Sequence, residues 1–158
     1  MRRLGVIGLA LLMIILVSCT NEETIDPPRF DDRDLRFNLL QSDNSLGLQS
    51  YVIEVQNAGK LKIGYLKLYV SYPIKQESGS RSNPFRVEGK TRSNNPVMLG
   101  EGDKAIFQVD APINDVFGDS ALLDFDHPNL NFEGYVLEGD QIIPFGLGGG
   151  LELIIRDY

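Results

Sequence analysis

The fold is decided by residues 51–59, YVIEVQNAG, in which large apolar side chains at 51, 53 and 55 alternate until the breaker Asn57-Ala58-Gly59. A period of two places one set of side chains in a core and the other towards water, as in a half-buried β-strand. The residues are mostly β-branched or aromatic, as strands favour. The same period recurs at 35–39, 66–72 and 105–109, with breakers at 73, 78–80, 94–96 and 100–103.

The last third of the chain continues this pattern. Residues 135–137 face 141–143 across Glu138-Gly139-Asp140, which predicts a hairpin whose turn uses the backbone freedom of glycine. Residues 121–125 are a candidate strand. The last predicted strand is 151–155, which follows a glycine-rich loop at 146–150. Only residues 110–119 favour a short helical turn. About seven to nine short strands predict an all-β antiparallel sandwich over residues 35–158, with a small closed barrel as the competing architecture.

A targeting segment precedes this domain. Arg2 and Arg3 lead into an uncharged apolar run at 4–17, the layout of a secretory signal peptide over residues 1–18. This run is shorter than the roughly 20 residues of a membrane-spanning helix. Residues 16–19, LVSC, resemble the lipobox of bacterial lipoproteins, which implies cleavage before Cys19 and lipidation of its sulfur, palmitate being a typical acyl group. The alternative is an ordinary thiol, which has no second cysteine to pair with.

Residues 19–34 are polar, acidic and interrupted by Pro27-Pro28, which predicts a disordered tether behind the lipidated cysteine. The cluster at 21–23, NEE, resembles the export signal of surface-exposed lipoproteins in Bacteroidota, although a plain acidic linker fits it equally well. The resemblance to lipoproteins implies two or more acyl chains on Cys19, which give stable anchoring. We therefore expect a cell-envelope protein whose partner is the outer membrane, with the periplasmic and the surface-exposed face both open.

Residues 51–59, 66–70 and 99–103 together resemble bacterial immunoglobulin-like modules, of which the cell-adhesion-related domain often called CARDB is the nearest type. Those modules share a strand ending in x-V-x-N-x-G, an alternating partner strand, and an L-x-x-G turn. The resemblance spans residues 35–109 and implies an immunoglobulin-like β-sandwich with a binding or structural role. Residues 110–158 depart from it, so their strand topology stays open.

Composition narrows the classes of partner. Without residues 1–18 the chain has 13 basic and 22 acidic residues, a net charge of −9. Nucleic-acid binding needs clustered Lys and Arg, so an acidic chain argues against that partner. We expect no cofactor, and a protein or glycan partner of unknown identity.

Catalytic interpretations find little support. His127 is the only histidine, and although Asp124 and Asp126 lie near it, no serine stands in a G-x-S-x-G context. The segment more simply marks a turn after a strand. We therefore expect a protein that is not an enzyme and has no catalytic residues.

Three further motifs are candidates for binding or modification. The oxygen-rich run of Asp124, Asp126, Asn129 and Asn131 is a weak calcium candidate, because its spacing is not that of an EF-hand and Asx turns explain it as well. Ser120, in Asp-Ser-Ala, resembles the O-glycosylation sites of exported Bacteroidota proteins. The glycine-rich loop at 146–150 lacks the Lys-Ser/Thr of a phosphate loop.

One predicted strand carries aromatic residues on both faces, at Tyr65, Tyr69 and Tyr72. An exposed aromatic stripe would bind sugar or protein, while core and edge packing explain the same residues. The leading hypothesis is a membrane-anchored lipoprotein with a non-catalytic binding or structural module at the cell envelope. The alternative is a glycan- or small-ligand-binding accessory protein of an uptake system.

Overall fold

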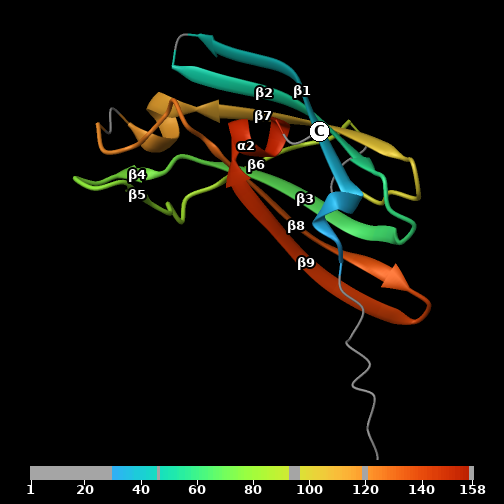
Figure 1. Ribbon diagram of the computed structural model, residues 1–158. Coiled ribbons are helices and arrows are strands. Elements are labelled where there is room, and N and C mark those ends of the chain that lie inside the picture. Colours follow the sequence, from blue (N-terminus) through green and yellow to red (C-terminus); the bar gives the residue numbers. More distant parts are fainter. Residues whose placement is uncertain (1–29, 46, 93–96, 119–120, 157–158) are drawn as a thin grey trace, which may run out of the picture.

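The structure is a computed structural model that describes residues 30–45, 47–92, 97–118 and 121–156 (Figure 1). The predicted signal peptide, Cys19, the tether as far as residue 29 and Ser120 lie outside the described residues. No helix in the described part is long and apolar enough to cross a membrane.

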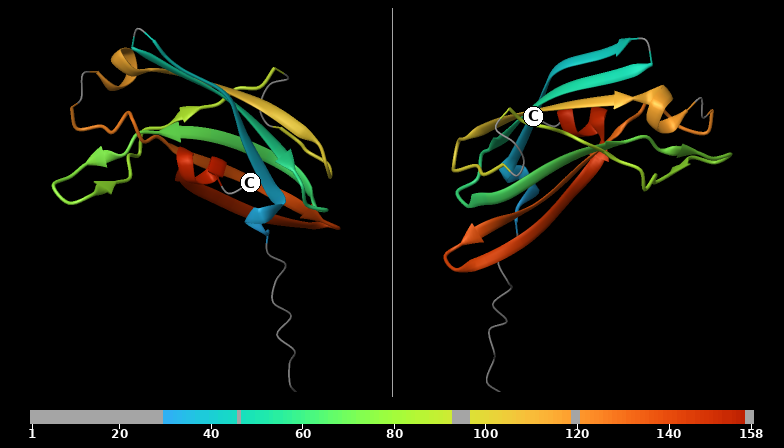
Figure 2. Two further views of the ribbon diagram at one scale, coloured as in Figure 1. Left: turned by 45° about the horizontal axis from the view of Figure 1, so that its top comes forward. Right: turned by 180° about the vertical axis from the view of Figure 1, so that it is seen from behind.

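Two antiparallel sheets form the body of the domain, and Figure 2 shows them as two layers. The first sheet has the order β1-β2-β7, with strands Leu35–Ser45, Leu48–Asn57 and Lys104–Pro112. The second has the order β6-β3-β8-β9, with strands Val87–Glu88, Lys62–Ser71, Asn129–Glu138 and Gln141–Gly150. A small hairpin joins β4 (Ile74–Lys75) to β5 (Ser80–Arg81).

This strand order is that of an immunoglobulin-like sandwich. Strands β1, β2 and β7 share one sheet. In the other sheet, β3 pairs with β8, the first strand of the hairpin formed by β8 and β9. The predicted all-β sandwich is therefore confirmed. The competing closed barrel is wrong, because the described strands form separate sheets with open edges.

The core lies between the sheets and is built from the side chains that the alternation selects. Tyr51, Ile53 and Val55 of β2 are buried, as are their counterparts on β3 and β7. Phe37 of β1 meets Phe132 of β8 across the sandwich, with ring centroids 4.3 Å apart. Burying a large apolar side chain stabilises the fold by about 1.5–3 kcal/mol, so this layer supplies most of the stability.

The predicted hairpin is confirmed: Glu138 pairs with Gln141, and Gly139 has a positive φ of 58°. The predicted helical turn is also confirmed, as the π-helical turn η2 (Ile113–Phe117). The expected strand at 121–125 is wrong. Only Leu123 forms an isolated bridge there, to Ile74, and most of the segment is turn.

The C-terminal segment differs from the prediction in two ways. Residues 146–150 are part of strand β9 rather than a loop, because their backbone hydrogen-bonds to β8. The sequence did not predict this strand, because glycines have no side chains and therefore show no alternation of apolar and polar residues. Residues 151–155, expected as the last strand, lie in the short helix α2 (Leu151–Arg156). Leu151, Ile154 and Ile155 pack against the core at helical spacing, while Leu153 is exposed.

Residues 30–34, expected to belong to the tether, pack against the domain. They include the 3-10 turn η1 (Asp32–Asp34), whose preceding Asp31 accepts a hydrogen bond from the Arg33 amide. The ring of Phe30 stacks on that of Phe145 in β9, with centroids 3.9 Å apart. Within the described residues, the packed part of the chain therefore begins at Phe30.

Candidate functional site

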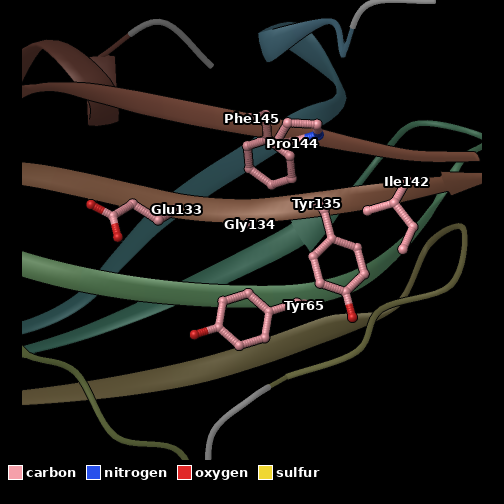
Figure 3. A pocket seen from close by; sticks show the side chains of 7 residues that line it. All are labelled: Tyr65, Glu133, Gly134, Tyr135, Ile142, Pro144 and Phe145. Carbon is pink, nitrogen blue, oxygen red and sulfur yellow. The ribbon is translucent and has the colours of Figure 1, made fainter.

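The strongest candidate site lies on the outer surface of the four-stranded sheet. Tyr65 of β3 pairs in register with Tyr135 of β8, and their rings are nearly parallel, at 7°, with centroids 5.7 Å apart. Figure 3 shows both rings face-on and next to each other. They border an open depression of about 550 Å³ with Glu133, Gly134, Ile142, Pro144 and Phe145. We call Tyr65, Tyr135, Glu133, Ile142 and Pro144 the tyrosine face.

A bulge in β3 makes room for this arrangement. The register between β3 and β8 shifts between Ile63 and Tyr65, at Gly64. A Cβ atom at Gly64 would meet Cε2 of Tyr135 well inside 3.0 Å, so the Tyr135 ring lies over a position where only glycine leaves space. The bulge and its glycine thus set where the second ring lies, a common role of bulges near functional surfaces.

Two ion pairs lie beside the two rings, on the side of Glu133. Lys67 pairs with Glu88 at 2.9 Å, and Arg86 pairs with Glu133. The hydrogen bond to Glu88 raises the pKa of Lys67, and the one to Glu133 raises the pKa of Arg86, so both cations remain charged. These four charges cancel, whereas the whole chain has a net charge of −7.

Of the three tyrosines predicted to lie on both faces of one strand, Tyr65 and Tyr69 share the outer face of β3, and Tyr72 lies beyond its end. Tyr69 lies on the outer face, where the Arg86 guanidinium carbon is 4.2 Å from its ring centroid. Tyr72, just beyond β3, is fully buried and contacts Phe117 and Phe125 edge-on. The partner of Tyr65 on the outer face is thus Tyr135, which is half-buried and for which the sequence predicted only a place in a hairpin. Only the pairing of two strands separated by some 70 residues brings the rings together, so no local signal identified it.

The oxygen-rich run does not converge on one point. Asp124 pairs with His127, whose Nδ1 is 3.1 Å from Oδ2, and Asp126 is exposed in the same turn. Asn129 and Asn131 lie on β8, where the Asn131 side-chain amide donates to the Ser71 hydroxyl at 3.4 Å. Within the described residues no group of three or more His, Cys, Asp or Glu side chains is arranged to hold a metal ion.

His127 is 68 % exposed and lies away from the tyrosine face. Its hydrogen bond to Asp124, and then the charge of that carboxylate, raise the pKa of His127. Partial burial alone would raise the pKa of Asp124, but the hydrogen bond and the charges of His127 and Lys75 together lower it. His127 and Asp124 thus form a surface ion pair that stabilises the turn before β8.

Neither a protein-family model nor a curated protein matches this chain. The site is therefore interpreted from the chemistry of its own residues.

Proposed function

We propose that this protein is a lipid-anchored, non-catalytic binding module of the cell envelope, and that the tyrosine face is its binding surface. The observation that carries the proposal is the pair of parallel rings, Tyr65 and Tyr135, at an open depression on a charge-balanced sheet. Two tyrosines supply a large, rigid contact area at a low cost in conformational entropy. Ligand sites are typically such concave, mainly apolar surfaces with a few polar groups.

The anchor is proposed from the lipobox resemblance at residues 16–19. Between Cys19 and Phe30 lie residues 20–29, which span at most about 35 Å when fully extended. A domain on so short a connection stays close to the bilayer, so its ligand would be a component of the envelope or a molecule that reaches it.

The anchor is tested by labelling cells that express the full chain with a palmitate analogue. We expect label on the wild-type protein and none on Cys19→Ala, because the thiol is the only acceptor of the thioether-linked lipid. An unlabelled wild-type protein would show that the lipobox interpretation is wrong.

The binding surface is tested with a photo-reactive amino acid at one of two exposed isoleucines. Ile142 lines the depression and is 64 % exposed, whereas Ile106 is 52 % exposed on the other sheet and serves as the matched control. Irradiation of living cells should yield a cross-linked species from position 142 and little from position 106. Equal yields at both positions, or none at either, would contradict the proposal.

A second candidate function, a glycan- or small-ligand-binding accessory protein of an uptake system, is favoured by the same open aromatic depression. It differs from the first in the class of ligand that the tyrosine face would bind.

A further inference from the structure

We infer, resting on the proposed function, that the ligand of the tyrosine face is an uncharged oligosaccharide with two successive sugar rings lying over Tyr65 and Tyr135. The inference depends on three features of the face: its flatness, its polar rim and its charge balance.

The flatness comes from the two rings. They are nearly parallel, at 7°, and are seen side by side in Figure 3. A pyranose ring presents C–H groups on its faces, which pack on the electron-rich face of an aromatic ring. The 5.7 Å between the centroids is comparable to the repeat of successive rings in an extended sugar chain. Two adjacent sugar units therefore fit two adjacent phenol rings.

The rim supplies hydrogen bonds of the kind that sugars need. A phenol hydroxyl both donates and accepts, and a carboxylate accepts at several positions. Glu133 lines the depression, and its carboxylate is held by Arg86. Sugar hydroxyls lie around the edge of the pyranose ring, so these groups are placed beside the stacked faces rather than beneath them.

The charge balance favours a neutral ligand. Lys67 and Arg86, the cations of the two ion pairs beside the rings, are already paired with carboxylates, so a phosphate or a uronate that bound to either would have to displace Glu88 or Glu133. A cationic ligand would have to compete with Arg86 for Glu133. An uncharged sugar avoids both costs.

The binding test uses the mature lipoprotein in a detergent without a sugar headgroup. The chain has six tyrosines and no tryptophan, so its intrinsic emission reports on tyrosine alone. Titration of the wild type with neutral hexasaccharides of glucose, xylose or mannose should give a saturable change in emission with at least one of them, and calorimetry measures binding to the variants, some of which lack a reporting ring. Tyr65→Ala and Tyr135→Ala should each weaken binding about tenfold, as expected for a lost ring contact.

Two variants separate ring position from ring identity. Gly64→Ala keeps both tyrosines but displaces the Tyr135 ring, so it should weaken binding as much as Tyr135→Ala. Tyr65→Phe keeps the ring and loses only the hydroxyl, so it should weaken binding less than Tyr65→Ala. Ile106→Ala, on the other sheet, should bind like the wild type.

Three outcomes would overturn the inference. A uronate hexasaccharide that binds as tightly as the neutral ones would show that charge balance does not select the ligand. Sugar binding that survives in Tyr65→Ala and Tyr135→Ala would place the sugar elsewhere. Failure of all the neutral sugars would exclude this ligand class, and binding of a proline-rich peptide instead would assign the face to a protein partner. The cross-link from Ile142 is independent of ligand class, so it distinguishes a wrong ligand from a wrong surface.

Discussion

At the residue scale, one buried amide explains why the strand that decides the fold ends in Asn-Ala-Gly. The Asn57 side-chain nitrogen donates to the carbonyl oxygens of Leu61 and Leu99, at 2.9 and 3.2 Å, and its oxygen accepts from the Gly59 amide at 3.1 Å. It thereby fixes the β2–β3 turn to the segment that precedes β7. Asn57, the asparagine of the strand end that resembles immunoglobulin-like modules, thus has a structural role.

Asn57→Ala should destabilise the protein by about 2–4 kcal/mol, because it leaves the Leu61 carbonyl and the Gly59 amide without their partners, whereas the Leu99 carbonyl keeps the Ile63 amide. Urea unfolding of the purified protein measures this. Asn38→Ala, at an exposed position of β1, is the control and should change stability by less than about 0.5 kcal/mol. Equal effects of the two variants would contradict the role of Asn57.

Two buried tyrosines should respond differently to loss of the hydroxyl. The Tyr51 hydroxyl donates to Gln49 at 2.8 Å, whereas the buried Tyr72 hydroxyl, which lies near that of Tyr51, makes no well-formed hydrogen bond among the described residues. Tyr72→Phe should therefore be neutral or stabilise by up to about 1 kcal/mol, while Tyr51→Phe should cost about 1–2 kcal/mol. Thermal unfolding of both variants checks this, and a larger loss in Tyr72→Phe would contradict it.

The His127–Asp124 pair should make stability depend weakly on pH. The pKa of His127 is raised, so the charged imidazole stabilises the folded protein fully below about pH 6.5, the ordinary pKa of histidine. That stabilisation is lost as the pH rises through the raised pKa. The pKa of Asp124 is lowered, so this carboxylate stabilises the folded protein fully above about pH 3.9, its ordinary pKa. That stabilisation is lost as the pH falls through the lowered pKa. NMR titration should show that Asp124→Asn lowers the pKa of His127; an unchanged pKa would exclude the pairing.

At the element scale, the β8–β9 hairpin shows what a sequence does and does not encode locally. Its turn was predictable, since Gly139 stands between two apolar runs. Its glycine-rich half was not, because residues without side chains show no period and their pairing with β8 is a tertiary property. Helix α2 was missed for the opposite reason: residues 151, 153 and 155 alternate like a strand, but packing selects Leu151, Ile154 and Ile155.

Two glycines of this hairpin should tolerate alanine very differently. A Cβ at Gly134 would meet the carbonyl oxygen of Tyr65, a backbone atom that cannot move aside, whereas a Cβ at Gly146 has nothing nearer than 3.9 Å. Gly134→Ala should therefore cost about 1–3 kcal/mol, and Gly146→Ala should be neutral or slightly stabilising. Urea unfolding distinguishes them, and equal stability of the two variants would contradict the strand pairing.

At the scale of the whole molecule, the alternation of residues along the chain predicted the sandwich and most of its core, but not the tyrosine face. That face needs the register of β3 on β8 and a bulge at Gly64, neither of which follows from local pattern. The result is a charge-balanced aromatic surface on a chain whose net charge is −7. This local charge balance is the feature from which an uncharged ligand is proposed.

The most direct test of the tyrosine face compares tyrosine nitration of the protein in intact envelopes with nitration of the purified lipoprotein, residue by residue, by mass spectrometry. A bound ligand should protect Tyr65 and Tyr135 in envelopes, and purification should expose both. Tyr51 and Tyr72, which are buried, should react slowly in both preparations. Equal nitration of Tyr65 and Tyr135 in envelopes and in the purified protein would contradict the assignment of this face as the binding surface.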